Sequence, residues 1–527
     1  MVAERRPTVD ESYWIATTPG TGSPPLTADV TADVAVIGGG IAGLCTAWEL
    51  VRAGLDVVVL EADRIAAGVT GNTTAKLTSL HSLTYARLEE RHGAESAELY
   101  ARSQQDAVEH TAALCVELKI DAELERAPAF TYVENADRAD EIRAEAAAAL
   151  KAGLDASYVT ETELPFPVAA AVRVADQLQF HPRKFLLGLA ERFTDEGGRI
   201  HERTRVTGLH DGSRCRLTTE NGATVEASDV VIATHYPVFD RALLFTRLKP
   251  RRELVIAAPV PAEAAPTGMY LSPEDSVRSV RSAPYSDGQR LLIVTGEKFE
   301  PGAGGVRGRF ARLDAWAGER LPGFADAEMA YRWAAQDNDS SDHLPYVGHA
   351  HPGTQHVYVA TGFGGWGMSN GVMAGRLLAA HIAGGGRPAW TELYDPRRLP
   401  PVSDTAELVK FQAAVAKHFV GDRLRTGHVD SVTDIAPGSG AVVRLAGQRC
   451  AVYRDEMGHA LVLSARCTHL GCLVQFNDAE RVWECPCHGS RFATDGSILH
   501  GPATRPLEPL EHREVPGAPG GEAEDQV

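Results

Sequence analysis

The segment from Val34 to Glu61 restricts the possible fold of this chain more than any other part of the sequence. Residues 34–37 form a short apolar run, and Gly38-Gly39-Gly40-Ile41-Ala42-Gly43 follows directly. A helical pattern then reaches Gly54, and a second apolar run at 57–60 ends at Glu61. Strand, helix and strand in this order predict a βαβ unit with a right-handed crossover, and therefore a parallel sheet.

The glycines between the first strand and the helix have the spacing of a dinucleotide-binding turn. Gly38 allows the tight turn, Gly40 lets the backbone approach a pyrophosphate, and Gly43 allows the helix to pack closely on the strand. The helix N-terminus offers unpaired N–H groups to that pyrophosphate. Glu61, at the end of the second strand, is placed to accept hydrogen bonds from a ribose. A glycine-rich turn without a ligand is the alternative.

Two later runs, 229–234 and 357–362, have the composition of further strands of the same sheet. Because these strands lie so far apart in the sequence, a second domain must interrupt the first. We expect an α/β Rossmann-type domain with an inserted α+β substrate domain, together spanning 31–395. The nucleotide-binding parts are expected at about 31–90, 176–239 and 336–385, and the insertions at about 91–175 and 240–335.

Composition assigns the remaining regions. Residues 1–30 are polar and interrupted by proline and glycine, so we expect an N-terminal arm rather than a folded unit. Residues 396–430 are expected to be a linker with a short helix at 406–419. Short strands with frequent turns predict an all-β domain over 431–511, and residues 512–527 have the composition of a disordered tail.

Two segments rich in glycine and hydroxyl residues indicate which dinucleotide is bound. The first runs from Arg64 to Lys76, and the second runs from Ala360 to Gly371 and leads into a helix. With these segments the chain resembles the D-amino-acid oxidase, glycine oxidase and sarcosine oxidase superfamily of FAD enzymes over about residues 31–385. The resemblance implies FAD, with the late glycine turn at the flavin. The implied cofactor-binding residues are Gly38, Gly40, Ile41, Ala42, Gly43, Glu61, Ala62, Arg64, Thr73, Thr74, Gly362, Gly367, Met368 and Ser369.

Some relatives hold the flavin covalently through histidine or cysteine. The segment 64–75 contains neither residue type, and residues 332–342 contain no cysteine. We therefore expect non-covalent FAD.

Four of the eight cysteines gather near the C-terminus, at positions 467, 472, 485 and 487. A secreted disulfide scaffold would not concentrate its cysteines in this way, whereas a local metal or redox site would. Cys467-Thr468-His469 and Cys485-Pro486-Cys487-His488 supply two cysteines and two histidines from two short loops. Such a set can bind zinc tetrahedrally or a Rieske [2Fe–2S] cluster, in which two histidines replace two cysteines on one iron.

Residues 431–510 resemble Rieske proteins, including Trp483 before the second loop and Gly501-Pro502-Ala503 after it. The resemblance implies that Cys467 and Cys485 bind one iron and that His469 and His488 bind the other. It also implies a disulfide between Cys472 and Cys487. Two free thiols are the alternative, because a reducing cytosol disfavours disulfides.

The same resemblance makes Ser490 a hydrogen-bond donor to a cluster sulfur. Phe492 stands where many high-potential relatives carry tyrosine, so one hydroxyl donor is missing. We expect a reduction potential below the top of the Rieske range of about −150 to +300 mV.

The sequence indicates the substrate-binding residues less clearly than the cofactor-binding residues. In the amino-acid and sarcosine oxidases an arginine before an Asp-x-x-Pro turn binds the substrate carboxylate, and Asp342-His343-Leu344-Pro345 matches that turn. Arg332 lies upstream, but several residues too far away, so an ion pair is its alternative role. Lys298 could face the flavin or be solvated, and Trp366 could form a wall of the active site. Lys76 and His81 lie near the flavin in sequence, but structural roles are favoured.

The excess of acidic over basic residues argues against some classes of binding partner. The 52 basic and 70 acidic residues give a net charge of −18, which argues against nucleic acid or an anionic membrane as partner. No apolar stretch of about 18 residues predicts a transmembrane segment. Polar residues 7–11 stand where a signal peptide needs its apolar region, so we expect a cytoplasmic protein.

The whole chain resembles a bacterial family of FAD-dependent oxidoreductases with C-terminal Rieske domains. This resemblance implies an enzyme in which a small substrate, an amine or amino acid, reduces FAD by two electrons. The cluster would pass them singly to an external acceptor. Two alternatives remain: an external donor reduces the cluster and feeds a flavin reductase or monooxygenase reaction, or the Rieske domain is a redox-sensing or docking module on an amine oxidase.

Overall fold

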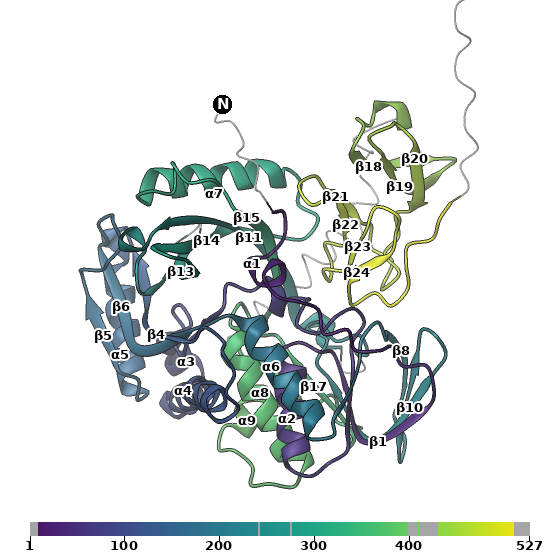
Figure 1. The fold of residues 1–527 in the computed structure, drawn as a ribbon, viewed down its shortest axis with the longest axis horizontal. Coiled ribbons are helices and arrows are strands. Elements are labelled where there is room, and N and C mark those ends of the chain that lie inside the picture. The colour runs from purple at the N-terminus through teal and green to yellow at the C-terminus, as the bar shows by residue number, and fades with distance from the viewer. Residues whose placement is uncertain (1–8, 241–242, 275–276, 399–408, 410–430, 511–527) are drawn as a thin grey trace, which may run out of the picture.

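A computed structural model describes residues 9–240, 243–274, 277–398, 409 and 431–510. The helix expected at 406–419 is almost entirely outside these residues, as is the expected tail at 512–527. Figure 1 shows a body of two sheets with helices and a smaller β domain beside it.

The first sheet contains the predicted parallel strands, in the order β16-β17-β10-β1-β2-β7. Strand β10 joins β1 on one side and β17 on the other, in parallel register, which confirms the prediction from two distant segments. The strands are β1 (Val30–Ile37), β2 (Val57–Leu60), β7 (Arg199–His201), β10 (Thr224–Ile232) and β17 (Val357–Thr361), with antiparallel β16 (Tyr346–His349), β8 (Val206–His210) and β9 (Cys215–Thr219).

Helices α2 (Ile41–Arg52), α6 (Pro182–Asp195) and α8 (Gly367–Ile382) accompany this sheet. Two glycines let α8 lie against α2. A Cβ at Gly371 would come within 2.5 Å of Ile41, and one at Gly375 within 2.7 Å of Cys45. The close packing aligns the N-termini of both helices at the same end of the sheet, where a dinucleotide is expected.

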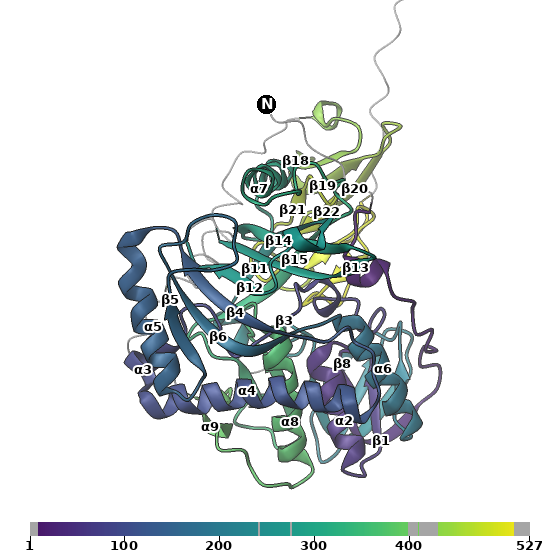
Figure 2. The ribbon, with the colours of Figure 1, turned by 60° about the vertical axis from the view of Figure 1, so that its left-hand side comes forward.

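The second sheet has the order β15-β11-β14-β13-β12-β4-β6-β3, with β5 paired to β6. Most of its strands come from the segments expected to form the inserted domain, whereas β3 comes from the segment at 31–90 that was expected to bind the nucleotide. Helix α4 runs beneath this sheet toward α8 (Figure 2). Its strands are β3 (Lys76–Leu77), β4 (Glu125–Val133), β5 (Ala156–Val159), β6 (Ala170–Gln179), β11 (Leu248–Pro261), β12 (Met269–Ser272), β13 (Arg278–Ser286), β14 (Gln289–Phe299) and β15 (Tyr331–Ser340). The remaining helices are α3 (Tyr85–His92), α4 (Ala94–Glu117), α5 (Ala139–Lys151), α7 (Val306–Arg320) and α9 (Thr391–Tyr394).

The expected N-terminal arm is packed against the body over its described part. Trp14, in the short helix α1 (Tyr13–Ala16), is fully buried, and its indole donates a hydrogen bond to the carbonyl of Thr73 at 2.7 Å. The Ser12 hydroxyl donates to the carbonyl of Gly71 at 2.5 Å. The polar composition of residues 1–30 did not indicate this packing, because two aromatic residues, Tyr13 and Trp14, supply the buried apolar surface.

The C-terminal domain is all β, as predicted. It combines the sheet β18 (Ser439–Leu445), β19 (Gln448–Arg454) and β20 (Ala460–Ser464) with the sheet β21 (Gln475–Asn477), β22 (Val482–Glu484), β23 (Arg491–Phe492) and β24 (Ile498–His500). It lies beside β11, β15 and the start of α7 (Figure 1). Within the described ranges, no helix is long and apolar enough to cross a membrane.

Candidate functional site

The glycine turn after β1 has the geometry that its sequence predicts. Gly38 has φ of 107°, and a Cβ there would lie 2.5 Å from the carbonyl oxygen of Ala233. A Cβ at Gly43 would lie 1.9 Å from the carbonyl oxygen of Gly38. Both positions therefore exclude any side chain, so the backbone at the start of α2 stays open to a ligand.

Glu61 directly follows β2 and turns its carboxylate back toward the glycine turn. One oxygen accepts a hydrogen bond from the Gly39 amide at 2.8 Å, and the other accepts from the Asp63 amide at 2.9 Å. Burial raises the pKa of this carboxyl, although both hydrogen bonds act in the opposite direction. The carboxylate oxygens thus stand at the cavity wall, where they can accept from ribose hydroxyls.

A cavity of about 530 Å³ opens at this end of the sheet. Predicted cofactor-binding residues that line it are Gly38, Gly40, Ile41, Ala42, Glu61, Ala62, Thr73, Thr74, Gly367 and Met368. Two segments nearly 300 residues apart in sequence therefore meet at one site, as FAD binding requires. The donor-rich turn, the buried carboxylate and the opposing helix N-terminus fit a dinucleotide.

Four predicted cofactor-binding residues lie outside the cavity lining. Gly43 packs against Gly38, and Gly362 lies in the left-handed region at φ 73°, against Leu248. Arg64 lies beside the Asp63 carboxylate at 3.9 Å. The Ser369 hydroxyl lies 3.0 Å from His81 Nε2.

The three predicted catalytic residues also lie outside the lining. Arg332 pairs with Asp10 at 3.2 Å, which is the alternative role that its spacing left open. Lys298 is 41% exposed and pairs with Asp339 at 3.2 Å. Trp366 stacks on His81 with ring centroids 4.5 Å apart.

Lys76 and His81 stay near the flavin-binding segments. Lys76 donates to the Thr74 hydroxyl at 2.8 Å, and burial, aided by the nearby Arg281, lowers the pKa of its ammonium to about 7. His81 is buried and lies 2.6 Å from the Tyr100 hydroxyl. Burial lowers the pKa of His81 to about 3, so its ring is neutral and structural.

The substrate-domain wall of the cavity comes from residues that the sequence analysis missed. Arg251 on β11 lines it, paired with Glu253 and, at 2.7 Å, with Asp339. Asp337 on β15 accepts from the Gly365 amide at 2.5 Å and lies 3.3 Å from His235 Nε2. Alternating polar residues on adjacent antiparallel strands were the available signal, but strand pairing was needed to read it.

The predicted cluster ligands lie together in the C-terminal domain. The rings of His469 and His488 have centroids 4.9 Å apart and stand at 90°. Hydrogen bonding between the neighbouring thiols lowers the pKa of Cys467 and raises that of Cys485. Among the described residues, Nδ1 of His469 and both ring nitrogens of His488 are buried without hydrogen-bond partners. Unpartnered imidazoles beside paired thiols fit a metal cluster with mixed nitrogen and sulfur ligands.

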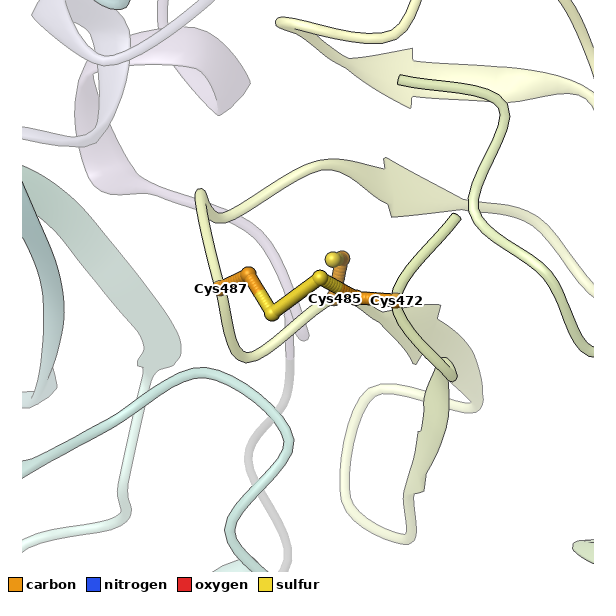
Figure 3. A group of neighbouring side chains, drawn as sticks. All are labelled: Cys472, Cys485 and Cys487. Carbon is orange, nitrogen blue, oxygen red and sulfur yellow. A yellow bond between two sulfur atoms is a disulfide. The ribbon is translucent and has the colours of Figure 1, made fainter. Parts of the chain in front are cut away.

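The predicted disulfide between Cys472 and Cys487 is present (Figure 3). The sulfurs of Cys472, Cys485 and Cys487 lie within 4.8 Å of one another, which is also a metal-binding spacing. Since the disulfide uses two of these sulfurs, Cys485 alone of the three is free to bind iron, together with Cys467. The disulfide links the two ligand loops next to the site.

Ser490 and Phe492 both lie in the core of the C-terminal domain, next to the ligand loops. The Ser490 side chain helps to lower the pKa of the Cys467 thiol, and its hydroxyl accepts from the Ala503 amide at 3.1 Å. Phe492 is fully buried in the same core as the four loop cysteines and pairs with Trp483 across β22 and β23.

Changing these two side chains should shift the reduction potential of the cluster in opposite directions. A hydroxyl donor stabilises the charge gained on reduction, and such a bond is worth roughly 1.5–3 kcal/mol. About 59 mV corresponds to 1.4 kcal/mol for one electron. With solvent competition, we expect Phe492→Tyr to raise and Ser490→Ala to lower the potential by some tens of millivolts. An EPR redox titration measures both, and two unchanged potentials would contradict the assigned contacts.

Trp14 should support FAD binding from the N-terminal segment, because its indole holds the Thr73 carbonyl beside the cavity. We expect Trp14→Ala to raise the Kd for FAD by about tenfold, equivalent to 1.4 kcal/mol. Flavin fluorescence during titration of the apoprotein reports the change. Trp316→Ala is the control, since this ring packs on Phe166 in the substrate domain. Equal affinities in the two variants would contradict the assigned role.

The turn, the shared cavity and the Cys/His pairs define a flavin-dependent oxidoreductase joined to an iron–sulfur domain. Sequence comparison agrees: the FAD dependent oxidoreductase (DAO) family matches residues 33–381, and the Rieske [2Fe-2S] domain matches 426–511. The chain belongs to the FAD dependent oxidoreductase family and carries a C-terminal Rieske domain. Its cofactors are FAD and a [2Fe–2S] cluster.

The chain is also similar to individual proteins of these families. The Rieske 2Fe-2S iron-sulfur protein YhfW of Bacillus subtilis (strain 168) is 32% identical over 95% of this chain and 97% of its own. Gamma-glutamylputrescine oxidoreductase of Escherichia coli (strain K12) is 25% identical over 68% of this chain and 85% of its own. Glycine oxidase from Geobacillus kaustophilus has a similar fold, with a TM-score of 0.58 and 21% identity over 70% of this chain and 99% of its own.

Proposed function

We propose that the protein oxidises a small amine or amino acid at a carbon–nitrogen bond and passes the electrons through its own Rieske cluster to an external acceptor. The relatives support this substrate class, since they include a gamma-glutamylputrescine oxidoreductase and a glycine oxidase. When bound, FAD supplies the two-electron acceptor and the cluster a one-electron relay.

One observation carries the proposal: the cavity that contains the dinucleotide turn is also lined by the Rieske domain. Ile498, Leu499, His500, Gly501 and Thr504 form part of its wall. His500 Nε2 lies 3.2 Å from Nδ1 of His235, which follows β10. An electron leaving this cavity therefore has the iron–sulfur domain as its immediate neighbour, which favours transfer within the chain.

The polar residues of the cavity wall suit orientation rather than strong base catalysis. The Arg251 guanidinium is already paired with two carboxylates, and Asp337 is held by the Gly365 amide. Hydride transfer from a neutral amine to a flavin requires correct positioning and no strong base. The fixed side chains on β11 and β15 would provide this positioning.

An anaerobic screen of amines, N-methyl amino acids and amino acids tests the proposal. We expect one class to bleach the flavin and then to produce the EPR signal of the reduced cluster without any added protein. Reduction of the cluster only by an added donor would indicate the reverse electron flow. A cluster that never equilibrates with the flavin would instead indicate a sensing or docking domain.

A further inference from the structure

The two imidazoles of the cluster site lie against the FAD-binding domain, with His488 buried and His469 half-buried. The ring of Tyr236 lies edge-on to His488 with centroids 5.8 Å apart, and edge-on to His469 at 6.4 Å. Phe245 contacts His488 from a second direction at 5.7 Å. Only 1% of His488 is exposed. Two aromatic rings from outside the Rieske domain therefore pack on His488, and one of them also contacts His469.

Tyr236 also belongs to the backbone segment that borders the cavity. It follows Thr234 and His235, which both line the cavity directly after β10. The Thr234 hydroxyl donates to the Tyr236 carbonyl at 2.7 Å, and the Tyr236 hydroxyl donates to the Phe245 carbonyl at 3.3 Å. These bonds fix a fully buried ring between the flavin cavity and the cluster ligands.

Further contacts hold the two domains at this place. The Gln336 amide on β15 donates to the carbonyl of Gly489 at 3.0 Å, one residue beyond the ligand His488. A Cβ at Gly489 would come within 2.6 Å of Gln336, so the loop approaches β15 as closely as a backbone can. The contact of Gln336 with Gly489 and the contact of Tyr236 with His488 thus fix how the cluster site is oriented toward the FAD-binding domain.

We infer that Tyr236 is the positioning residue through which the flavin cavity and the Rieske cluster are coupled. The inference rests on the proposed function. In each transfer one electron leaves the reduced flavin and the oxidised cluster gains it, while the flavin protons pass to water. The second electron follows after an external one-electron oxidant, such as ferricyanide, has taken the first from the cluster.

Flash reduction of the flavin tests the inference without a known substrate. A laser flash with EDTA as donor reduces the flavin of the intact holoprotein anaerobically, and freeze-quenched EPR follows the reduced cluster. We expect Tyr236→Ala to slow cluster reduction about tenfold, because the histidine ligands lose the two edge-to-face contacts that position them against the flavin-binding domain. Tyr236→Phe retains the ring and should restore the wild-type rate. Phe245→Ala, which removes one contact with His488, should slow it less.

The cluster potential provides a second measurement, which reports whether the Tyr236 ring lies against the ligand His488. Removing the Tyr236 ring admits water to His488, and water stabilises the charge gained on reduction, so the potential should rise. Tyr358→Ala is the control and should leave the cluster potential unchanged, because this buried ring on β17 stacks on His349. An unchanged transfer rate in folded Tyr236→Ala overturns the inference. Absence of transfer in the wild type would instead refute the proposed function.

Discussion

His488→Ala should remove the Rieske spectrum completely while FAD stays bound. The variant loses one of two imidazole ligands, and no other histidine among the described residues lies in the cysteine loops to replace it. The residues expected to hold the pyrophosphate and the ribose lie in and beside β1, α2 and β2, which the substitution does not touch. Iron analysis, EPR and the flavin absorption of the purified protein measure the outcome.

A second histidine of the same domain offers a matched control for this experiment. The side chain of His459 is 73% exposed and pairs with Asp455 on the surface. His459→Ala should keep both cofactors. Two irons per chain in His488→Ala would refute the ligand assignment, and loss of FAD would show that the Rieske wall of the cavity is needed to retain the flavin.

Both cofactor sites could be predicted from sequence because their determinants are local. At Gly38 and Gly43 a side chain would collide with the backbone, so the residue type itself reports the geometry. The cluster ligands likewise come from two short loops, Cys467 to Cys472 and Cys485 to His488. In each case a few consecutive residues contain all the information.

The substrate side could not be predicted in the same way, because it depends on which strands pair. Arg251 reaches the cavity since β11 lies between β15 and β14, and nothing near it in sequence indicates this order. Arg332 is at the far end of β15, where the N-terminal segment supplies its partner Asp10. A shift of one residue in a strand reverses which face a side chain occupies.

Contacts between the domains were also invisible in the sequence. Arg252 and Glu484 are separated by 232 positions, yet both side chains are fully buried and form an ion pair. Burial of a charge is costly unless a partner is present, so neither residue looks like a core residue by composition. Only the folded chain shows that each supplies the other's partner.

Arg252→Ala should therefore weaken the attachment of the Rieske domain strongly. The guanidinium of Arg252 also pairs with Glu480 at 3.0 Å, and Arg491 shares the same carboxylate at 2.7 Å. Removing one partner of a buried pair leaves an uncompensated charge, at a cost of about 3–5 kcal/mol. We expect a lower thermal transition and faster proteolysis between the domains. Arg312→Ala removes an exposed guanidinium from Glu297, which keeps Arg278 as a partner, so it should cost only about 0–1 kcal/mol.

Acid should weaken the same contact in the wild type. Burial alone would raise the pKa of Glu480, but Arg252 and Arg491 lower it to about 2 from the ordinary 4.5. A carboxyl with a depressed pKa contributes stability that is present above pH 4.5 and lost as the pH falls toward 2. Arg252→Ala removes part of this depression, so its acid transition should begin at higher pH. Proteolysis rates measured from pH 7 to 3 would reveal the shift, and parallel profiles in the two proteins would contradict the role assigned to Arg252.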